Sequence, residues 1–217
     1  MKILIFGVGN NADLAYYYLT NDSEYEIVAF VLETDFIKEN TKFGLPIVDF
    51  ENIKKKYNPS EYSLFAPCDY SKLNKYRERI YNKGKQMGYN FISYISSKAN
   101  VFTNDIGENC FIFEDTIIQP YTKIGNNCIL WSGATVCHHS VIEDFVFIAS
   151  NAVIAGCCLI KKYSFIGINS SIRDCTTIEE NTVVGMHSCV TKNTKSYNIY
   201  IGCPAKILKK CDDTVII

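Results

Sequence analysis

The chain has 217 residues, of which 47% are hydrophobic, so it is long enough to bury a core as one large domain or two small ones. Its 22 basic and 23 acidic side chains give a formal net charge of −1, which argues against a nucleic acid partner. The apolar run Ile3–Phe6 is too short for a signal peptide or a membrane span, so we expect a cytoplasmic protein without membrane contact. The ten cysteines are scattered without paired spacing, and we expect them to be reduced.

Residues 1–95 alternate between short apolar runs and helical patterns, which predicts a small Rossmann-like α/β domain. The expected strands are Ile3–Phe6, Ile27–Leu32 and Leu64–Ala66. A first helix would place Leu14, Ala15, Tyr18 and Leu19 on one face, and a basic helix would run from about Leu73 to Met87. The pattern changes near Ser96 and Ser97, so we expect one domain over 1–95 and a second over 96–217.

A Gly7-x-Gly9 turn lies between the first expected strand and the first expected helix. Backbone N–H groups at the start of a helix bind phosphate in this context. The third glycine of a dinucleotide fingerprint is replaced by Ala12, so the turn by itself is a weak signal and implies no nicotinamide cofactor.

The second domain is predicted from a strict period of six residues. Starting at Ile106, every sixth position up to Val190 is aliphatic, fifteen positions in all. Four residues after each of them stands a small or β-branched residue, from Cys110 to Thr194. An ordinary sandwich of alternating strands would not keep this period over such a length.

This period indicates a chain that turns a corner every six residues, so that three hexads close one triangular coil. The aliphatic residues would point into the prism and the small residues would occupy its tighter inward positions. Fifteen hexads make five coils, which at ~4.8 Å per stacked strand give a prism about 24 Å tall. Known hexapeptide prisms wind left-handed, so we expect a left-handed parallel β-helix.

A small Gly-x-Gly α/β domain followed by a hexapeptide prism resembles the bacterial nucleotide-sugar acetyltransferases, including bacillosamine-pathway N-acetyltransferases and sialic acid O-acetyltransferase-like proteins. The resemblance covers nearly the whole chain. Its local motifs are Ile5-Phe6-Gly7-Val8-Gly9-Asn10-Asn11, Asn74-Lys75-Tyr76-Arg77, the segment from Val136 to Phe145, Phe165-Ile166-Gly167-Ile168-Asn169-Ser170, and Gly202-Cys203-Pro204-Ala205-Lys206.

The resemblance implies that a histidine on the prism wall acts as general base, and His138 matches it by register. An imidazole is mostly neutral at cytosolic pH, which suits this role. The family usually follows its base with a carboxylate, but this chain has His139 there, so Glu143, Asp144 or a backbone carbonyl would have to orient the ring. The family also often has a second histidine nine residues after the base, where this chain has Phe147. Oxyanion stabilisation would then rest on backbone N–H groups, best at Gly156.

The resemblance further implies that acetyl-CoA is the acyl donor, with the pantetheine arm lying along a groove between neighbouring prisms of a homotrimer. The matching positions are Ala155, Gly156, Gly167 and Ile168. A glycine at the second place of a hexad is also a routine corner residue, which is the competing interpretation of Gly167.

The expected acceptor is a nucleotide-linked amino sugar. By resemblance the N-terminal turn and acidic residues after the second strand hold the nucleotide sugar, at Gly7, Gly9, Asn10, Asn11, Glu33 and Asp35. Asn74 and Arg77 match a further element, in which the guanidinium would meet a phosphate in a bidentate way. A solvated basic helix face with Lys72, Lys75 and Lys83 is the alternative.

Three other functions remain open from sequence: O-acetylation of a sialic acid-like acceptor, a non-catalytic nucleotide-sugar-binding module, and a zinc hydratase built on the same kind of prism. The hydratase needs three convergent histidines. His138 and His187 are separated by two coils and thirteen residues, which places them on different faces, and we expect the adjacent His138 and His139 to point in opposite directions. We therefore expect no metal.

Overall fold

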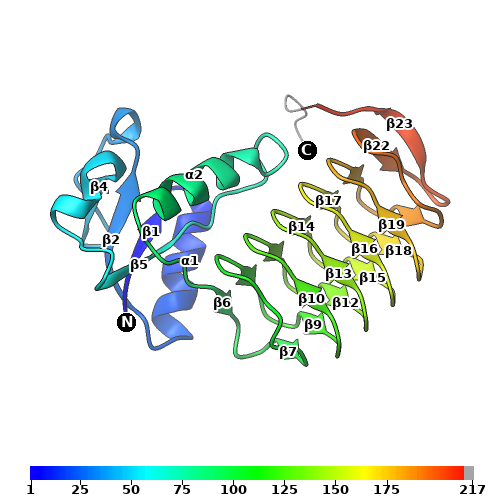
Figure 1. The fold of residues 1–217 in the computed structure, drawn as a ribbon, viewed down its shortest axis with the longest axis horizontal. Helices are drawn as coiled ribbons and strands as arrows, with labels where there is room; N and C mark the ends of the chain where they lie inside the picture. The colour runs from blue at the N-terminus through cyan, green and yellow to red at the C-terminus, as the bar shows by residue number, and fades with distance from the viewer. Residues whose placement is uncertain (213–217) are drawn as a thin grey trace. The chain divides into compact units, whose positions relative to one another are not determined.

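The computed structural model describes residues 1–212, which form two compact units (Figure 1). The first unit contains Met1–Asp69 and Arg77–Ile92, and the second contains Tyr70–Tyr76 and the chain from Ser93 onward. The division after Ile92 lies close to the seam that we predict near Ser96. The assignment of Tyr70–Tyr76 to the second unit has no signal in the sequence.

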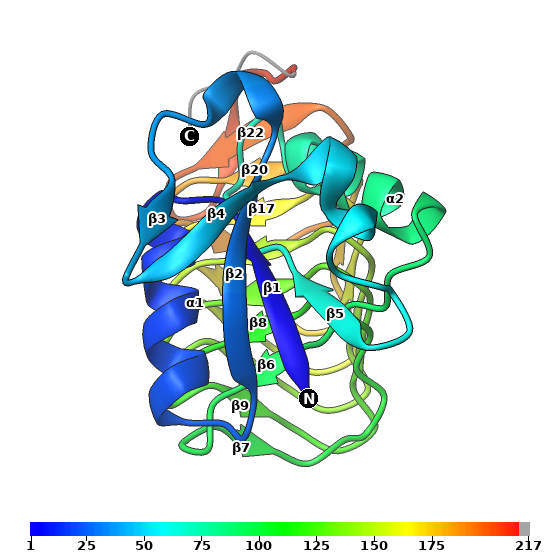
Figure 2. The same cartoon turned by 90° about the vertical axis from the view of Figure 1, so that its left-hand side faces the viewer.

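The first unit is built on a five-stranded sheet with the order β3-β4-β2-β1-β5, seen face-on in Figure 2. Its pairs are parallel except for β3 with β4. The elements are β1 (Lys2–Phe6), α1 (Asn10–Asn21), β2 (Glu26–Leu32), the 3₁₀ helix η1 (Thr34–Phe36), β3 (Thr41–Lys42), β4 (Leu45–Asp49), the 3₁₀ helix η2 (Phe50–Lys55) and β5 (Tyr62–Phe65). The second helix, α2 (Lys75–Gln86), spans the boundary between the units.

The three predicted strands are therefore present, and α1 buries one face as expected from its periodicity. Its buried residues are Ala12, Ala15 and Leu19, whereas the predicted Leu14 and Tyr18 are half-buried. The basic helix begins at Lys75, two residues later than expected, because Lys72, Leu73 and Asn74 all have positive φ, between 51° and 66°. Three consecutive left-handed residues cannot belong to a right-handed helix.

The second unit is a left-handed parallel β-helix with three walls (Figure 1). In its middle coils each wall is a parallel stack of two-residue strands, in which successive members are 18 residues apart. We name each wall by one strand. The β13 wall contains β10 (Lys123–Ile124), β13 (Val141–Ile142), β16 (Leu159–Ile160) and β19 (Thr177–Ile178). The β12 wall contains β7 (Asn100–Val101), β9 (Ile117–Ile118), β12 (Thr135–Val136), β15 (Val153–Ile154), β18 (Ser171–Ile172) and β21 (Cys189–Val190). The β14 wall contains β6 (Tyr94–Ile95), β8 (Phe111–Ile112), β11 (Ile129–Leu130), β14 (Phe147–Ile148), β17 (Phe165–Ile166), β20 (Val183–Val184) and two end strands, β22 (Asn198–Ile201) and β23 (Lys206–Lys210).

The core of the prism consists of the residues that the six-residue period selects. The aliphatic series from Ile112 to Val190 is at most 2% exposed, and the small series packs beside it. Burial of this continuous aliphatic column is the main favourable contribution to the stability of the coil stack. Both predicted series are thus confirmed. All ten cysteines are free, and several of them, such as Cys110 and Cys128, occupy the small inward positions.

Each corner of the prism depends on one residue with left-handed backbone, three places after the aliphatic residue. From Asn109 to His187 every such position has a positive φ, between 53° and 74°. Asparagine, which tolerates this conformation best among residues with a side chain, occupies several of these places. The corner geometry therefore fixes the backbone of His139, which has a φ of 58°.

The last coil is covered on the β14 wall by a hairpin. β22 continues the parallel stack beside β20, and β23 then pairs with β22 in the antiparallel sense. All five residues of β23, Lys-Ile-Leu-Lys-Lys, are exposed. In the part of the chain that the structure describes, no helix has the length and apolar character needed to cross a membrane.

Gly167 is a corner glycine whose replacement should destabilise the prism. A Cβ at this position would lie 2.6 Å from the carbonyl oxygen of Val184 and 2.7 Å from backbone atoms of Gly185 and Met186. Backbone atoms in the next coil cannot move aside without disturbing the ladder. We expect Gly167→Ala to lower the free energy of unfolding by about 1–3 kcal/mol, the usual cost of overpacking.

Denaturant titration measures this effect. Met186→Ala is a suitable control, because Met186 is 70% exposed at the neighbouring place of the same corner. Equal unfolding midpoints for Gly167→Ala and the unmodified chain would contradict the steric argument.

Candidate active site

His138 and His139 form the corner between the β12 wall and the β13 wall. We call this edge of the prism the histidine corner; in successive coils it comprises residues 119–121, 137–139, 155–157 and 173–175. β12 leads into His138, and β13 begins two residues after His139. The period therefore positions both histidines on an outer edge of the prism, as the sequence predicts for His138.

Hydrogen bonds from neighbouring coils hold the backbone of His138 on both sides. Its N–H donates to Oε1 of Gln119, 2.9 Å away, and its carbonyl accepts from the N–H of Cys157 at 2.9 Å. This hydrogen bond between His138 and Gln119 was not predicted from the sequence. Its only signal is the spacing of 19 residues, one coil plus one place, which puts Gln119 beside His138 in the preceding coil.

The two imidazole rings contact each other, with their Nδ1 atoms 3.1 Å apart. The expectation that His138 and His139 point in opposite directions is therefore wrong. The left-handed backbone of His139 turns its ring back toward His138, and the His139 ring also packs on Tyr121 with centroids 4.8 Å apart. Because one Nδ1 must donate and the other accept, this contact can fix the tautomer of His138 in place of the carboxylate that the family usually has.

Gly156 provides the space in which the His138 ring lies. A Cβ at Gly156 would be 2.6 Å from Cε1 of His138 and 2.8 Å from its Nε2. The carbonyl of Gly156 accepts from the N–H of Cys175 at 3.0 Å, but its own N–H donates to no acceptor within residues 1–212. A backbone donor and the distal ring nitrogen of His138 are thus side by side.

The four residues expected to bind the acyl donor divide into two pairs at different corners. Ala155 and Gly156 lie at the histidine corner, whereas Gly167 and Ile168 follow β17 at the corner between the β14 and β12 walls. The N–H of Ala155 donates to the carbonyl of Ile172 at 3.1 Å and that of Gly167 to Val184 at 2.8 Å. Both N–H groups therefore donate to carbonyls of the next coil. They are not available to bind pantetheine, and the expectation for Ala155 and Gly167 is corrected in this respect. Ile168, which is 47% exposed, has no ladder bond from its N–H among the described residues.

Phe147, at the place of the family's second histidine, belongs to an aromatic cluster on the β14 wall. It stacks on Phe165 at 5.1 Å, and the ring of Tyr70 meets both edge-on at 5.1 and 5.2 Å. Phe147 is only 4% exposed. Phe147 is therefore a packing residue of the β14 wall, and its side chain has no polar group.

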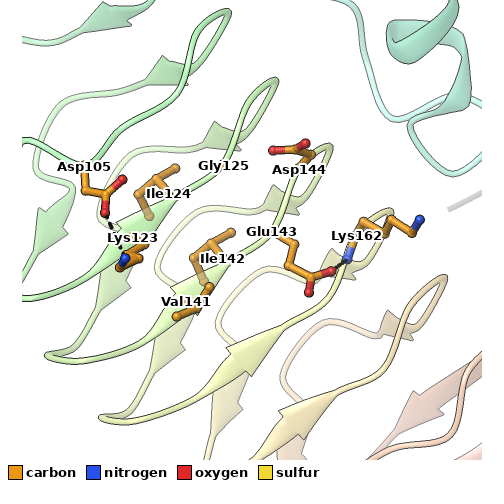
Figure 3. A pocket seen from close by; sticks show the side chains of 9 residues that line it. All are labelled: Asp105, Lys123, Ile124, Gly125, Val141, Ile142, Glu143, Asp144 and Lys162. Carbon is orange, nitrogen blue, oxygen red and sulfur yellow. Dashed lines mark hydrogen bonds and ion pairs between the residues drawn. The ribbon is translucent and has the colours of Figure 1, made fainter.

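A hollow of about 310 Å³ lies on the β13 wall and contains neither histidine (Figure 3). Figure 3 shows that charged side chains rim it, among them Asp105 paired with Lys123 at 3.4 Å, and Glu143, which accepts from the backbone N–H of Lys162 at 3.0 Å. Glu143 and Asp144 lie at the far edge of this wall, so they do not orient His138.

In the first unit, the Gly-x-Gly turn leads directly into the N-terminus of α1. Gly7 has a φ of +102°, which a side chain would strain, and its N–H donates to Val31 at 2.8 Å. Gly9 is the N-cap of α1 and provides no side-chain cap. Asn10 and Asn11 form the first turn, and the exposed Gly9 and Asn10 leave that helix end open.

The other predicted substrate residues have different surroundings. Glu33 follows β2, and its carboxylate forms a bidentate ion pair with Arg79 at 2.7 and 2.8 Å, which the sequence did not indicate. Asp35 is exposed in η1. The guanidinium of Arg77 donates to the carbonyls of Cys68 and Asp69 at 3.1 and 3.0 Å, and the side chain is fully buried. Arg77 therefore binds the backbone of the segment that precedes α2. The expected bidentate contact with a phosphate is not supported.

Asn74 is also fully buried and has a φ of 66°, so it belongs to the left-handed turn before α2. His187, by contrast, lies at the corner between the β14 and β12 walls, away from the histidine corner, so the three histidines do not converge within one chain.

Residues 105–138 of the second unit match the family model of the bacterial transferase hexapeptide (six repeats). No curated protein sequence matches the chain.

Solved structures share the fold over nearly the whole chain. The acetyltransferase domain of PglB from Neisseria gonorrhoeae FA1090 matches with a TM-score of 0.82 at 21% identity, covering 95% of this chain and 99% of the other. The perosamine N-acetyltransferase from Caulobacter crescentus, solved as a variant with CoA and GDP-perosamine, matches with a TM-score of 0.83 at 22% identity, covering 97% and 98%. WeeI from Acinetobacter baumannii AYE matches with a TM-score of 0.82 at 20% identity, covering 96% and 100%. The chain thus shares the fold of these three proteins over both of its units.

Proposed function

We propose that this chain is an acetyltransferase that moves the acetyl group of acetyl-CoA to the amino group of a nucleotide-linked sugar. The observation that carries the proposal is the paired His138 and His139 over Gly156, in a fold shared over both units with N-acetyltransferases. One of those proteins was solved with CoA and GDP-perosamine. A glycan-building pathway in the cytoplasm is the setting that we propose.

The contact between the two rings suggests how the proton moves. If Nδ1–H of His138 donates to Nδ1 of His139, the lone pair of His138 is on Nε2, the atom beside Gly156. As the sugar amine attacks the thioester carbon, Nε2 takes a proton from the amine. The free N–H of Gly156 would stabilise the oxyanion, and when the tetrahedral intermediate collapses, the CoA sulfur leaves and receives the proton from Nε2.

The nucleotide would bind to the first unit. The open N-terminus of α1, with Gly7, Gly9, Asn10 and Asn11, suits a diphosphate, and Glu33 and Asp35 follow the neighbouring strand. We assign no phosphate contact to the buried Arg77.

The test is release of CoA from acetyl-CoA in the presence of nucleotide-linked amino sugars, with free sialic acids as the alternative acceptors. We expect turnover with an amino sugar nucleotide, and turnover that survives a chelator. Turnover with sialic acid alone would replace N-acetylation by O-acetylation. If calorimetry detected binding of a nucleotide sugar but no CoA were released, the chain would be a binding module. If a chelator abolished the activity and zinc restored it, the proposed mechanism would be refuted.

We further propose a homotrimer in which adjacent chains complete each site. The histidine corner lies on an outer edge of the prism, and Gly156 and the exposed Ile168 lie at the two corners that flank the β12 wall, so a second prism packed beside this wall would form a groove with both. Closed cyclic assemblies provide such repeated grooves. Light scattering should give three times the mass of one chain. A fully active monomer would contradict this prediction.

His139 should act as a positioning residue for the base. We expect His139→Ala to lower kcat by about tenfold, because a hydrogen bond of roughly 1.4 kcal/mol then no longer fixes the tautomer of His138. His139→Glu should preserve most of the rate, since a carboxylate can accept from Nδ1–H. Steady-state kinetics at saturating acetyl-CoA measure both. A loss in His139→Ala larger than that in His138→Ala would move the base to His139.

A further inference from the structure

Two cysteines are stacked at the histidine corner, one coil apart. Cys157 and Cys175 occupy the same left-handed place of their hexads, with φ values of 59° and 54°. The N–H of Cys157 donates to the carbonyl of His138 at 2.9 Å, and the N–H of Cys175 donates to that of Gly156 at 3.0 Å. Both are therefore held in the same column as His139.

This stacking gives the two residues the separation that a disulfide requires. Equivalent residues of adjacent parallel strands are ~4.8 Å apart, within the range of roughly 4.4–6.8 Å seen between the Cα atoms of disulfide-bonded cysteines. Both cysteines are exposed. The neighbouring Cys158 is buried in the core and donates to the carbonyl of Arg173, so it cannot compete for either thiol.

The thiols also contact each other. Desolvation raises the pKa of the Cys175 thiol, with further contributions from the adjacent Cys157 and Asp174 and from a hydrogen bond between the two cysteine side chains, while Arg173 opposes the shift. The raised pKa favours the thiol form of Cys175.

We propose that Cys157 and Cys175 form a modification site at which a peroxide closes a disulfide beside the two histidines. The Cys157 sulfur attacks one peroxide oxygen and breaks the O–O bond, which gives a sulfenic acid and one water. The Cys175 sulfur then attacks the sulfenyl sulfur, the S–S bond forms, and the hydroxyl leaves with the Cys175 proton as a second water. Two thiols are oxidised by two electrons in all, and one peroxide is reduced.

The experiment uses the full chain, reduced, freed of reductant and treated with hydrogen peroxide. A second pair, Cys189 with Cys203, also has hydrogen-bonded side chains, so the measurement is made in the Cys203→Ser background. We expect the intact mass to fall by two hydrogens, dithiothreitol to reverse this, and peptide mapping to join Cys157 to Cys175. Adding Cys175→Ser as the matched variant should abolish the mass loss.

Separate oxidation of the two thiols to sulfinic acids, a disulfide between two copies of the chain, or unchanged alkylation of both thiols after peroxide would each overturn the proposal. The readout is a covalent mass and a peptide map. Its failure is therefore distinguishable from a failure of the acetyltransferase proposal, which is read from CoA release.

Discussion

Replacing His138 with alanine is expected to lower kcat at least ~10²-fold, about 2.7 kcal/mol of transition-state stabilisation. The attacking amine must lose a proton as the tetrahedral intermediate forms, and Nε2 of His138 is the distal ring nitrogen beside Gly156. The affinity for acetyl-CoA should change little, because the ring is proposed to act on the acceptor. Turnover at saturating substrates, with calorimetry of acetyl-CoA binding, separates chemistry from binding.

The matched control for His138→Ala is His187→Ala. Both histidines lie at prism corners, but His187 belongs to the corner between the β14 and β12 walls and has no part in the proposed mechanism. It should retain the unmodified rate. If His138→Ala turned over at a near-native rate while His139→Ala were inactive, the assignment of the base would be off by one residue.

Gly156→Ala should also lower kcat, by about 10²-fold, without weakening the fold. The added Cβ would fall 2.6 Å from Cε1 of His138, so the ring must rotate away from its position and from Nδ1 of His139. Misplacement of a catalytic group by about 1 Å can cost this much. The atoms that the added Cβ meets belong to the His138 side chain, which can rotate, so we expect no loss of stability. Because alanine also lowers the entropy of the unfolded chain, the free energy of unfolding should stay equal or rise by about 0.4–1 kcal/mol.

Kinetics and denaturant titration on the same preparations test this prediction. Gly167→Ala provides the comparison, because its Cβ meets backbone atoms and should reduce stability. A Gly156→Ala variant that keeps full activity would show that His138 does not depend on the space above Gly156. A variant that unfolds more readily than Gly167→Ala would contradict the expected stability.

The prism could be predicted from the sequence because one short period determines burial, strand register and corner positions together. Given Ile106 and the step of six, the wall on which Ile142 or Phe165 lies follows without further information. The first unit has no such constraint. The strands β3 and β4 are short or only half-buried, and the left-handed turn at Lys72 to Asn74 depends on packing that leaves no local pattern.

For the candidate site, the sequence indicated where residues lie on the prism but not which contacts they make. Register was sufficient to place His138 on an outer edge and to bring Gly156 one coil away. The contact between His138 and His139 depends on a positive φ at each corner, and a ring on such a backbone does not follow the alternation expected of a strand. Arg77 matched a motif in the sequence, yet its guanidinium donates to the backbone carbonyls of Cys68 and Asp69. The sequence pattern does not indicate these two hydrogen bonds.

The hairpin of β22 and β23 bears on whether the protein stays in solution. A stack of parallel coils has an unpaired strand at each end, and an unpaired edge can add strands from other molecules without limit. On the β14 wall, β23 reverses direction, so a further parallel coil cannot add in register, and its lysines repel another copy of themselves. A chain cut before Asn198 would expose β20 as a fresh edge, and fibrous aggregation would be the expected result.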